Sequence, residues 1–228
     1  MIDYQFTALG RLISASKSAD APLEALVLHG AGKATRHRSQ WIAEFLEKHG
    51  TGCISFDFIG HGQTGGEMQG TTLAMRRVQA EVAADQLDRR KAVIGFSMGG
   101  HIAIDIACDQ EFGSLILFCP AIYPDSAWQA PFGDIFSKEI RKPDAWMSST
   151  ALKKLSSYKG RIMVIIGDRD TVIPNVLPES IQEAATLASS VRIHRVPGAD
   201  HYLLGYLLDN TSAREKVLDL VYRTIKGD

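Results

Sequence analysis

The feature that most constrains the fold is an alternation of short apolar runs with amphipathic helical patterns along most of the chain. Most of these runs are unbroken, which is typical of parallel strands that are covered on both faces. Helical patterns separate the runs, such as the one that begins at Trp41 and ends at Gly50. This alternation predicts an α/β protein with a mainly parallel sheet and helices on both faces. The expected strands are residues 25–28, 53–56, 92–96, 115–119, 162–166 and 191–196.

Two extended segments precede these runs. Residues 4–8 and 11–14 flank the turn Leu9-Gly10 and predict an antiparallel hairpin, which brings the sheet to eight strands. Ser212 and Glu215 have the spacing of a capping box, so we expect the last helix to begin there. The other helical patterns cover residues 73–87, 99–108 and 178–188.

One segment, residues 124–160, interrupts this alternation and contains Trp128, Phe132, Phe136 and Trp146. We interpret it as a small cap over the strand ends, with an ordinary crossover helix and irregular flanks as the alternative. No repeat or linker divides the rest of the chain. A single domain over residues 1–228 is therefore expected, a length that can bury one substantial core.

A candidate nucleophile follows the expected strand 92–96. Parallel sheets of this kind bind ligands at the carboxyl ends of their strands. Here Gly95-Phe96-Ser97-Met98-Gly99 has the pattern G-x-S-x-G. A serine hydroxyl is a weak nucleophile, so it must be held exposed beside a base at a sharp strand-to-helix turn. Small residues two before and two after Ser97 permit that turn. The helix start directs amides at developing negative charge, so the Met98 amide is expected to be one arm of an oxyanion hole.

A candidate base and several candidate acids follow the last two strands. His201 comes after the turn Pro197-Gly198 and can reach the carboxyl edge of the sheet beside Ser97 as a general base. Asp168 and Asp170 both follow the run 162–166, and one of them must orient the imidazole. Asp168 is suited to capping its own turn. Asp200 adjoins the histidine, where its carboxylate cannot easily turn back to the ring.

Four motifs, in this order, resemble the α/β-hydrolase family over nearly the whole chain. The order Ser, Asp, His is also the one that this fold uses. The resemblance implies an α/β-hydrolase fold with a small cap, a second oxyanion amide at Ala31, and Asp170 as the acid. The motifs are Leu28-His29-Gly30-Ala31-Gly32, Asp57-Phe58-Ile59-Gly60-His61-Gly62-Gln63-Thr64, the turn around Ser97, and the paired loops at residues 167–174 and 198–201.

Charge and composition limit the classes of binding partner that we expect. With 25 basic and 26 acidic side chains the net charge is −1, so bulk charge does not recruit nucleic acid or an anionic membrane. There is no signal peptide pattern and no apolar run of about 18 residues. The three cysteines are odd in number and lie in apolar stretches, as reduced core residues do. We expect a cytoplasmic monomer or homodimer.

No cofactor or metal is expected. Residues 60–65 formally match the dinucleotide pattern G-x-G-x-x-G, but loop residues follow where that fold needs a helix. No spacing of histidine, cysteine and aspartate resembles a zinc site.

The expected function is hydrolysis of a small carboxylic ester through an acyl-enzyme on Ser97. Within the family, the alternative is a thioesterase or another hydrolase of acyl or C–C bonds. The alternative of another class is a non-catalytic protein that binds small ligands. The basic cluster Lys33, Arg36 and Arg38 either receives an anionic substrate or is a solvated helix entrance. The expected pocket residues are His29, Gly30, Tyr123, Trp128, Phe132 and Trp146.

Overall fold

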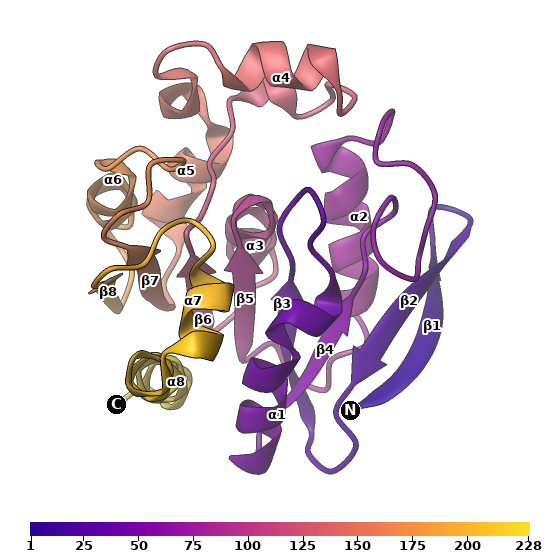
Figure 1. Ribbon diagram of the computed structural model, residues 1–228, viewed down its shortest axis with the longest axis vertical. Coiled ribbons are helices and arrows are strands. Elements are labelled where there is room, and N and C mark those ends of the chain that lie inside the picture. The colour runs from indigo at the N-terminus through magenta and orange to yellow at the C-terminus, as the bar shows by residue number, and fades with distance from the viewer.

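Eight strands form one sheet in the computed structural model, which describes residues 1–228 (Figure 1). The strands are β1 (Ile2–Ala8), β2 (Arg11–Lys17), β3 (Leu23–Leu28), β4 (Gly52–Phe56), β5 (Ala92–Phe96), β6 (Ser114–Phe118), β7 (Arg161–Gly167) and β8 (Ser190–Val196). Their order in the sheet is β1-β2-β4-β3-β5-β6-β7-β8. β1 pairs with β2, and β2 with β4, in antiparallel fashion. All other neighbours are parallel, so the predicted fold class is confirmed.

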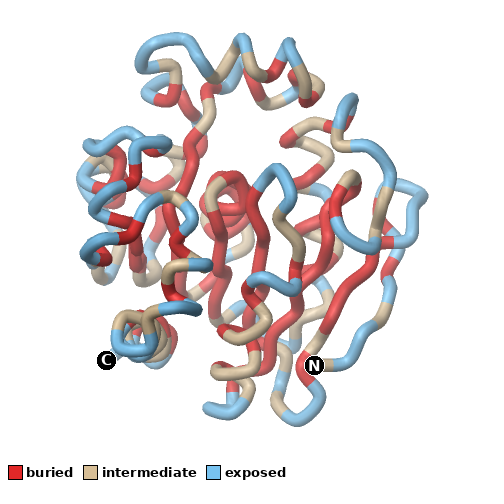
Figure 2. The backbone as a smooth tube through the Cα atoms, in the orientation of Figure 1, coloured by how far each residue is buried: buried red, intermediate tan, exposed pale blue.

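The core lies in the middle of this sheet. Every residue of β4, β5 and β6 is buried, which explains why their sequences are apolar apart from Ser55 and Ser114. Figure 2 shows the buried backbone concentrated in these central strands. Several strands extend past the apolar run that predicts them, because backbone pairing continues where the side chains become polar. β7, for example, begins at Arg161, which pairs with Ser114 on one side and Ser190 on the other.

Helices cover both faces of the sheet. The α-helices are α1 (Gln40–Lys48), α2 (Leu73–Ala84), α3 (Met98–Asp109), α4 (Asp134–Ile140), α5 (Thr150–Lys154), α6 (Leu177–Ala184), α7 (Leu203–Asp209) and α8 (Thr211–Lys226). α1 and α8 pack together on one face, whereas α3 packs on β3, β5 and β6 between α2 and α5 on the other. None of these helices combines the length and the apolar character that crossing a membrane requires.

The carboxyl-terminal helices differ from the prediction. α8 begins at Thr211 rather than at Ser212, and no side chain caps its first turn, so the predicted capping box is wrong. The helix α7 ends immediately before α8 and already directs the chain into it. α7 itself was not predicted, because it has only seven residues and carries Gly205 in its interior.

The segment 124–160 between β6 and β7 contains several short helices rather than one crossover helix. Figure 1 shows α4 standing apart from the sheet, above the end from which β6 leads into this segment. Besides α4 and α5, its short 3-10 helices are Asp125–Ala127, Ala145–Ser148 and Leu155–Ser157.

Arg76 of α2 connects this segment to the rest of the molecule. Its buried guanidinium carbon lies 4.9 Å from the ring centre of Phe58, which follows β4, and 4.7 Å from that of Phe132. Burial lowers the pKa of Arg76 to about 9. The two aromatic faces provide cation–π contacts to a side chain that forms no ion pair, so this arginine packs the segment against the sheet.

Candidate active site

Ser97 stands where the connectivity of the sheet changes direction. The chain runs from β3 outward to β4 and then returns to β5 on the other side of β3, which makes β3 and β5 the switch point. Loops diverge at such a point and leave a crevice at the carboxyl ends of the strands. Ser97 directly follows β5, and α3 begins at the next residue. The loop of residues 29–39 that follows β3 lies at the same edge.

The backbone of Ser97 adopts a conformation that a non-glycine residue rarely occupies, with φ 49° and ψ −114°. Hydrogen bonds on both sides hold it there. The Ser97 amide donates to the Phe118 carbonyl at 2.9 Å, and the Ser97 carbonyl accepts from the amides of Gly100 and Ala121 at 2.9 and 3.0 Å. Strain of this kind persists only where the surroundings determine it, and it is concentrated at functional sites.

The two glycines that flank Ser97 allow the turn to pack closely. A Cβ atom on Gly95 would lie 2.5 Å from the Gly99 carbonyl oxygen. A Cβ atom on Gly99 would clash with the backbone carbonyls of Leu28 and His29, at 2.6 Å from the latter. The steric reason for small residues on both sides of Ser97 is therefore present in the structure.

Three side chains from distant parts of the sequence form a hydrogen-bonded line. The Ser97 hydroxyl oxygen lies 3.1 Å from Nε2 of His201, and Nδ1 of His201 lies 2.9 Å from Oδ2 of Asp170. The other carboxylate oxygen, Oδ1, accepts from the amides of Val172 and Ile173 at 2.8 and 3.0 Å. The proton on His201 is thereby assigned to Nδ1, which leaves Nε2 free to accept the serine proton.

Asp170 is held as a carboxylate. Burial alone would raise its pKa, but the hydrogen bonds from His201 and from the amides of Ile173 and Val172 outweigh burial, so the pKa lies below the ordinary value. An ionised acceptor keeps the imidazole oriented and stabilises the imidazolium that forms when the ring takes a proton.

The two other candidate acids shape the loop that carries His201. Asp168 accepts a hydrogen bond from the Gly198 amide at 2.8 Å, so it holds the neighbouring loop rather than capping its own turn. Asp200 accepts from the Tyr202 amide at 2.8 Å. Neither carboxylate is hydrogen-bonded to the ring, and only Asp170 is brought to it.

The two amides expected to form an oxyanion hole donate to no acceptor within the protein. Met98 is the first residue of α3, where amides have no partner in the helix, and Ala31 lies in the loop after β3. This loop packs tightly on the turn at Ser97, because a Cβ atom on Gly30 would lie 3.3 Å from that of Ser97.

His29 is a structural residue of the same loop. Its Nδ1 donates to the Gly30 carbonyl at 2.6 Å, and its Nε2 accepts from the Phe58 amide at 3.0 Å. Burial lowers the pKa of His29 to about 3 and that of the neighbouring His61 to about 4, so both rings are neutral near pH 7. Their ring centres lie 4.8 Å apart.

A cavity of about 730 Å³ opens beside Ser97 and His201. Of the expected pocket residues, His29 and Gly30 line it, and so does Ala31. Residues of helix α7, which was not predicted, also line the cavity. Because these residues closely follow His201 in the sequence, they could have been expected near the site. The remaining lining residues are Gly32, Lys33, Ala34, Thr35, Arg38, Ser39, Phe96, Phe118, Cys119, Tyr202, Leu203, Leu204, Gly205 and Leu208.

Four expected pocket residues do not line this cavity, which corrects the prediction. Trp128 lines a separate cavity of about 270 Å³, together with His101. The backbone amide of Tyr123 donates to His101 at 3.3 Å. Phe132 packs against Arg76, and Trp146 is buried in the hydrophobic core. Aromatic side chains in this segment therefore hold the segment together.

The basic cluster divides into one buried and two exposed cations. Arg36 is 2% exposed and forms a buried ion pair with Asp57, so it is not part of a solvated helix entrance. Lys33 and Arg38 are exposed and line the cavity.

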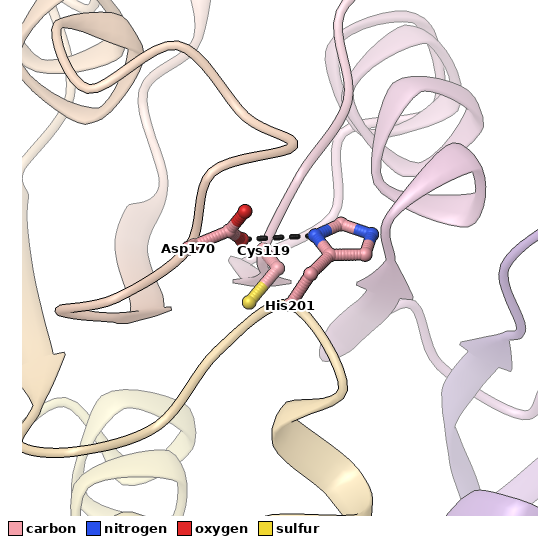
Figure 3. A group of neighbouring side chains, drawn as sticks. All are labelled: Cys119, Asp170 and His201. Carbon is pink, nitrogen blue, oxygen red and sulfur yellow. Dashed lines mark hydrogen bonds and ion pairs between the residues drawn. The ribbon is translucent and has the colours of Figure 1, made fainter.

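Cys119 was not predicted to lie at this site, although it follows β6 at the same edge of the sheet. Figure 3 shows its sulfur beside Asp170 and His201, and one potential ligand atom from each residue lies within 4.8 Å of the others. Thiolate, carboxylate and imidazole are ligands for zinc. Burial, however, raises the pKa of the Cys119 thiol, which disfavours the thiolate that a metal needs. Asp170 and His201 are also already bonded to each other.

Comparisons with known proteins are consistent with this architecture. Residues 25–155 match the sequence model described as the alpha/beta hydrolase family. No curated protein matches the sequence.

Similar solved structures cover almost the whole chain. Est1E from Butyrivibrio proteoclasticus, solved with ferulic acid, is 17% identical, with 96% of this chain and 99% of that chain covered and a TM-score of 0.70. An esterase from Pyrococcus furiosus is 23% identical, with coverages of 98% and 92% and a TM-score of 0.69. The thioesterase domain from the curacin biosynthetic pathway is 17% identical, with coverages of 96% and 99% and a TM-score of 0.70. At these identities the likeness shows a shared fold.

Proposed function

This chain belongs to the alpha/beta hydrolase family, and on that premise we propose that it is a serine hydrolase that cleaves a small carboxylic ester through an acyl-enzyme on Ser97. The observation that carries the proposal is the line from the Ser97 hydroxyl through His201 to Asp170, at a serine with φ 49°. A partly exposed serine hydroxyl within hydrogen-bonding distance of an imidazole Nε2 is the arrangement that acyl transfer needs.

In the first half of the proposed reaction, the Ser97 oxygen attacks the ester carbonyl carbon while its proton passes to Nε2 of His201. The carbonyl oxygen becomes negatively charged, and the amides of Met98 and Ala31 donate hydrogen bonds to it. His201 then gives its proton to the departing alcohol oxygen as the carbon–oxygen bond breaks. The acyl group remains on Ser97, and Asp170 stabilises the imidazolium in between.

In the second half, a water molecule takes the place of the alcohol. His201 accepts a proton from the water as the water oxygen attacks the acyl carbon. It then returns the proton to the Ser97 oxygen as the acyl–serine bond breaks. The products are a carboxylic acid and the regenerated serine.

The neighbours in fold support a hydrolase, since they include esterases and a thioesterase domain. A thioester is therefore the second candidate substrate, because the same attack and the same proton transfers cleave it. The neutral character of His29 also supports His201 as the base, since His29 already uses both ring nitrogens in hydrogen bonds.

Labelling by a fluorophosphonate tests the proposal directly. The probe should modify Ser97 in the native protein, and Ser97→Ala should abolish both the labelling and the hydrolysis of short p-nitrophenyl esters. Ser39 is the matched control because it is a second serine that lines the same cavity. Ser39→Ala should still be labelled.

Two results would contradict the assignment. Labelling at another serine would overturn the choice of nucleophile. A complete lack of labelling and turnover, with small molecules still bound in the cavity, would favour a non-catalytic binding protein.

A further inference from the structure

The cavity beside Ser97 has an unbalanced charge. Two cationic side chains, Lys33 and Arg38, contribute to its wall, whereas no aspartate or glutamate does. Neither cation forms a salt bridge, and neither side chain forms a hydrogen bond within the protein. Cations that share a concave surface without nearby acids attract anions to it.

Arg36 explains why these two side chains face the cavity. Its guanidinium is buried against Asp57, donates from Nε to the Ser16 hydroxyl at 2.8 Å, and donates from Nη2 to Gln63 at 2.6 Å. Its backbone amide also donates to Asp57 at 2.8 Å. Arg36 therefore anchors the loop between β3 and α1 to the interior of the protein.

Another part of the cavity wall comes from the residues that follow His201. Tyr202 is 75% exposed and Leu208 is 49% exposed, and both line the cavity. Leu203 and Leu204 add further apolar surface. In the proposed reaction His201 delivers a proton to the leaving group, so a cavity bounded by the His201 loop lies where the leaving group departs.

We propose that the leaving group of the substrate has an apolar body and a negative charge, a carboxylate or a phosphate, which Lys33 and Arg38 bind. This inference rests on the proposed function and adds its substrate class. The apolar body would lie along Tyr202 and the leucines of α7, and the charge would lie near the loop after β3. Hydrogen bonds between guanidinium or ammonium groups and an anion are stronger than those between neutral groups.

A matched pair of esters tests the charge. The anionic substrate is 4-butyryloxybenzoate, and the neutral one is its methyl ester, so both present the same acyl group and the same aromatic ring. The variant Lys33→Gln/Arg38→Gln should raise KM for the anionic ester about tenfold, since each exposed contact contributes modestly. The KM for the methyl ester should rise far less than the KM for the anionic ester.

One further pair of thioesters identifies the source of the charge, and one ester charged on its acyl side locates the charge. Butyryl-4′-phosphopantetheine and butyryl-pantetheine differ only in a phosphate on the leaving group. A loss confined to the phosphopantetheine thioester would indicate phosphate, and one confined to 4-butyryloxybenzoate would indicate carboxylate. 4-Nitrophenyl hemiglutarate carries its charge on the acyl side, so the double variant should hydrolyse it as the native protein does. Lys159→Gln, at an exposed lysine outside the cavity, is the control variant.

The outcomes separate this inference from the proposed function. Equal KM changes for the anionic and neutral members of each pair, or no change for any of these substrates, would overturn the inference while leaving the serine hydrolase intact. A loss on the hemiglutarate would overturn the assignment of the charge to the leaving group. If the native protein cleaves none of the esters or thioesters and Ser97 is not acylated, the proposed function fails, and this inference fails with it.

Discussion

At the scale of single residues, Asp170 uses its two carboxylate oxygens for different tasks. One oxygen faces the His201 ring, and the other accepts two backbone amides from the turn that follows. The amide hydrogen bonds fix the carboxylate in place independently of the histidine. The loop after β7 therefore fixes the position of Asp170, and Asp170 in turn orients the imidazole.

Replacing this carboxylate by an amide tests its role. Asp170→Asn keeps the shape but offers an N–H group to Nδ1 of His201, which favours the tautomer with its proton on Nε2. That tautomer cannot accept the Ser97 proton, so kcat should fall by about a thousandfold or more. Steady-state kinetics on a short p-nitrophenyl ester would measure this.

Asp168→Asn is the matched control. An asparagine oxygen can still accept from the Gly198 amide, so we expect activity within about threefold of the native value. A comparable loss in both variants would show that the carboxylates act through the loop structure rather than through the ring.

The residues of the hydrogen-bonded line could be located from the sequence because each follows a recognisable strand. Parallel strands end at one edge of the sheet, so residues placed after them converge. The pocket side chains could not be assigned in this way. Trp128, Phe132 and Trp146 occur in a segment without a repeating pattern, and an aromatic residue there can face either a ligand or its own core. The inward direction of Arg36 depends on Asp57, a contact across 21 positions of the sequence.

At the scale of elements, the contact between the start of α3 and the end of β3 sets the position of Ser97. Gly99 lies directly against the carbonyl oxygens of Leu28 and His29. The strand and the helix approach this closely because the helix carries no side chain at that position.

Gly99→Ala should therefore destabilise the protein and reduce its activity. The added methyl group must displace backbone, which costs about 1–3 kcal/mol of unfolding free energy. Gly205→Ala is the control, because a Cβ atom there has no neighbour within 4 Å and Gly205 lies inside helix α7. It should stabilise the protein by about 0.5–1 kcal/mol. Urea unfolding of both variants would measure this, and equal effects of the same sign would contradict it.

Element types could be predicted better than element ends. The strands were recognisable from their apolar runs, but their ends depend on pairing with neighbours, which the sequence does not display locally. The start of α8 depends on α7, whose seven residues lie directly before it. Short helices of this kind derive their stability from packing more than from their own propensity.

At the scale of the whole molecule, buried histidines couple folding to pH. Burial lowers the pKa of His101 to about 4, and those of His29 and His61 are also lowered. In the unfolded chain these rings titrate near about 6.5. The unfolded state therefore binds more protons between these values. The stabilisation is complete above about pH 6.5 and is lost as the pH falls toward 4.

Chemical denaturation between pH 7.5 and pH 4.5 would measure this loss. For His101 alone, the difference between pKa values of about 6.5 and 4 corresponds to about 3 kcal/mol. The variant His101→Gln retains an acceptor for the Tyr123 amide but does not titrate, so its stability should decline less steeply than that of the native protein. Identical slopes for the two proteins would show that His101 does not contribute.

The long connection between β6 and β7 also bears on how such a protein can diversify. Both of its ends are fixed by the direct pairing of these strands, and its middle contacts α2 and α3. The Phe132 ring packs on Arg76, the Ala74 amide donates to the Trp128 carbonyl at 3.2 Å, and Lys154 forms ion pairs with Asp105 and Asp109. Ser97, His201 and Asp170 make none of these contacts. The stretch can thus be lengthened, shortened or rewritten while the reactive hydroxyl and its partners keep their places. Because no residue of the segment 124–160 lines the cavity beside Ser97, changes in this segment can accumulate without altering the chemistry at the serine.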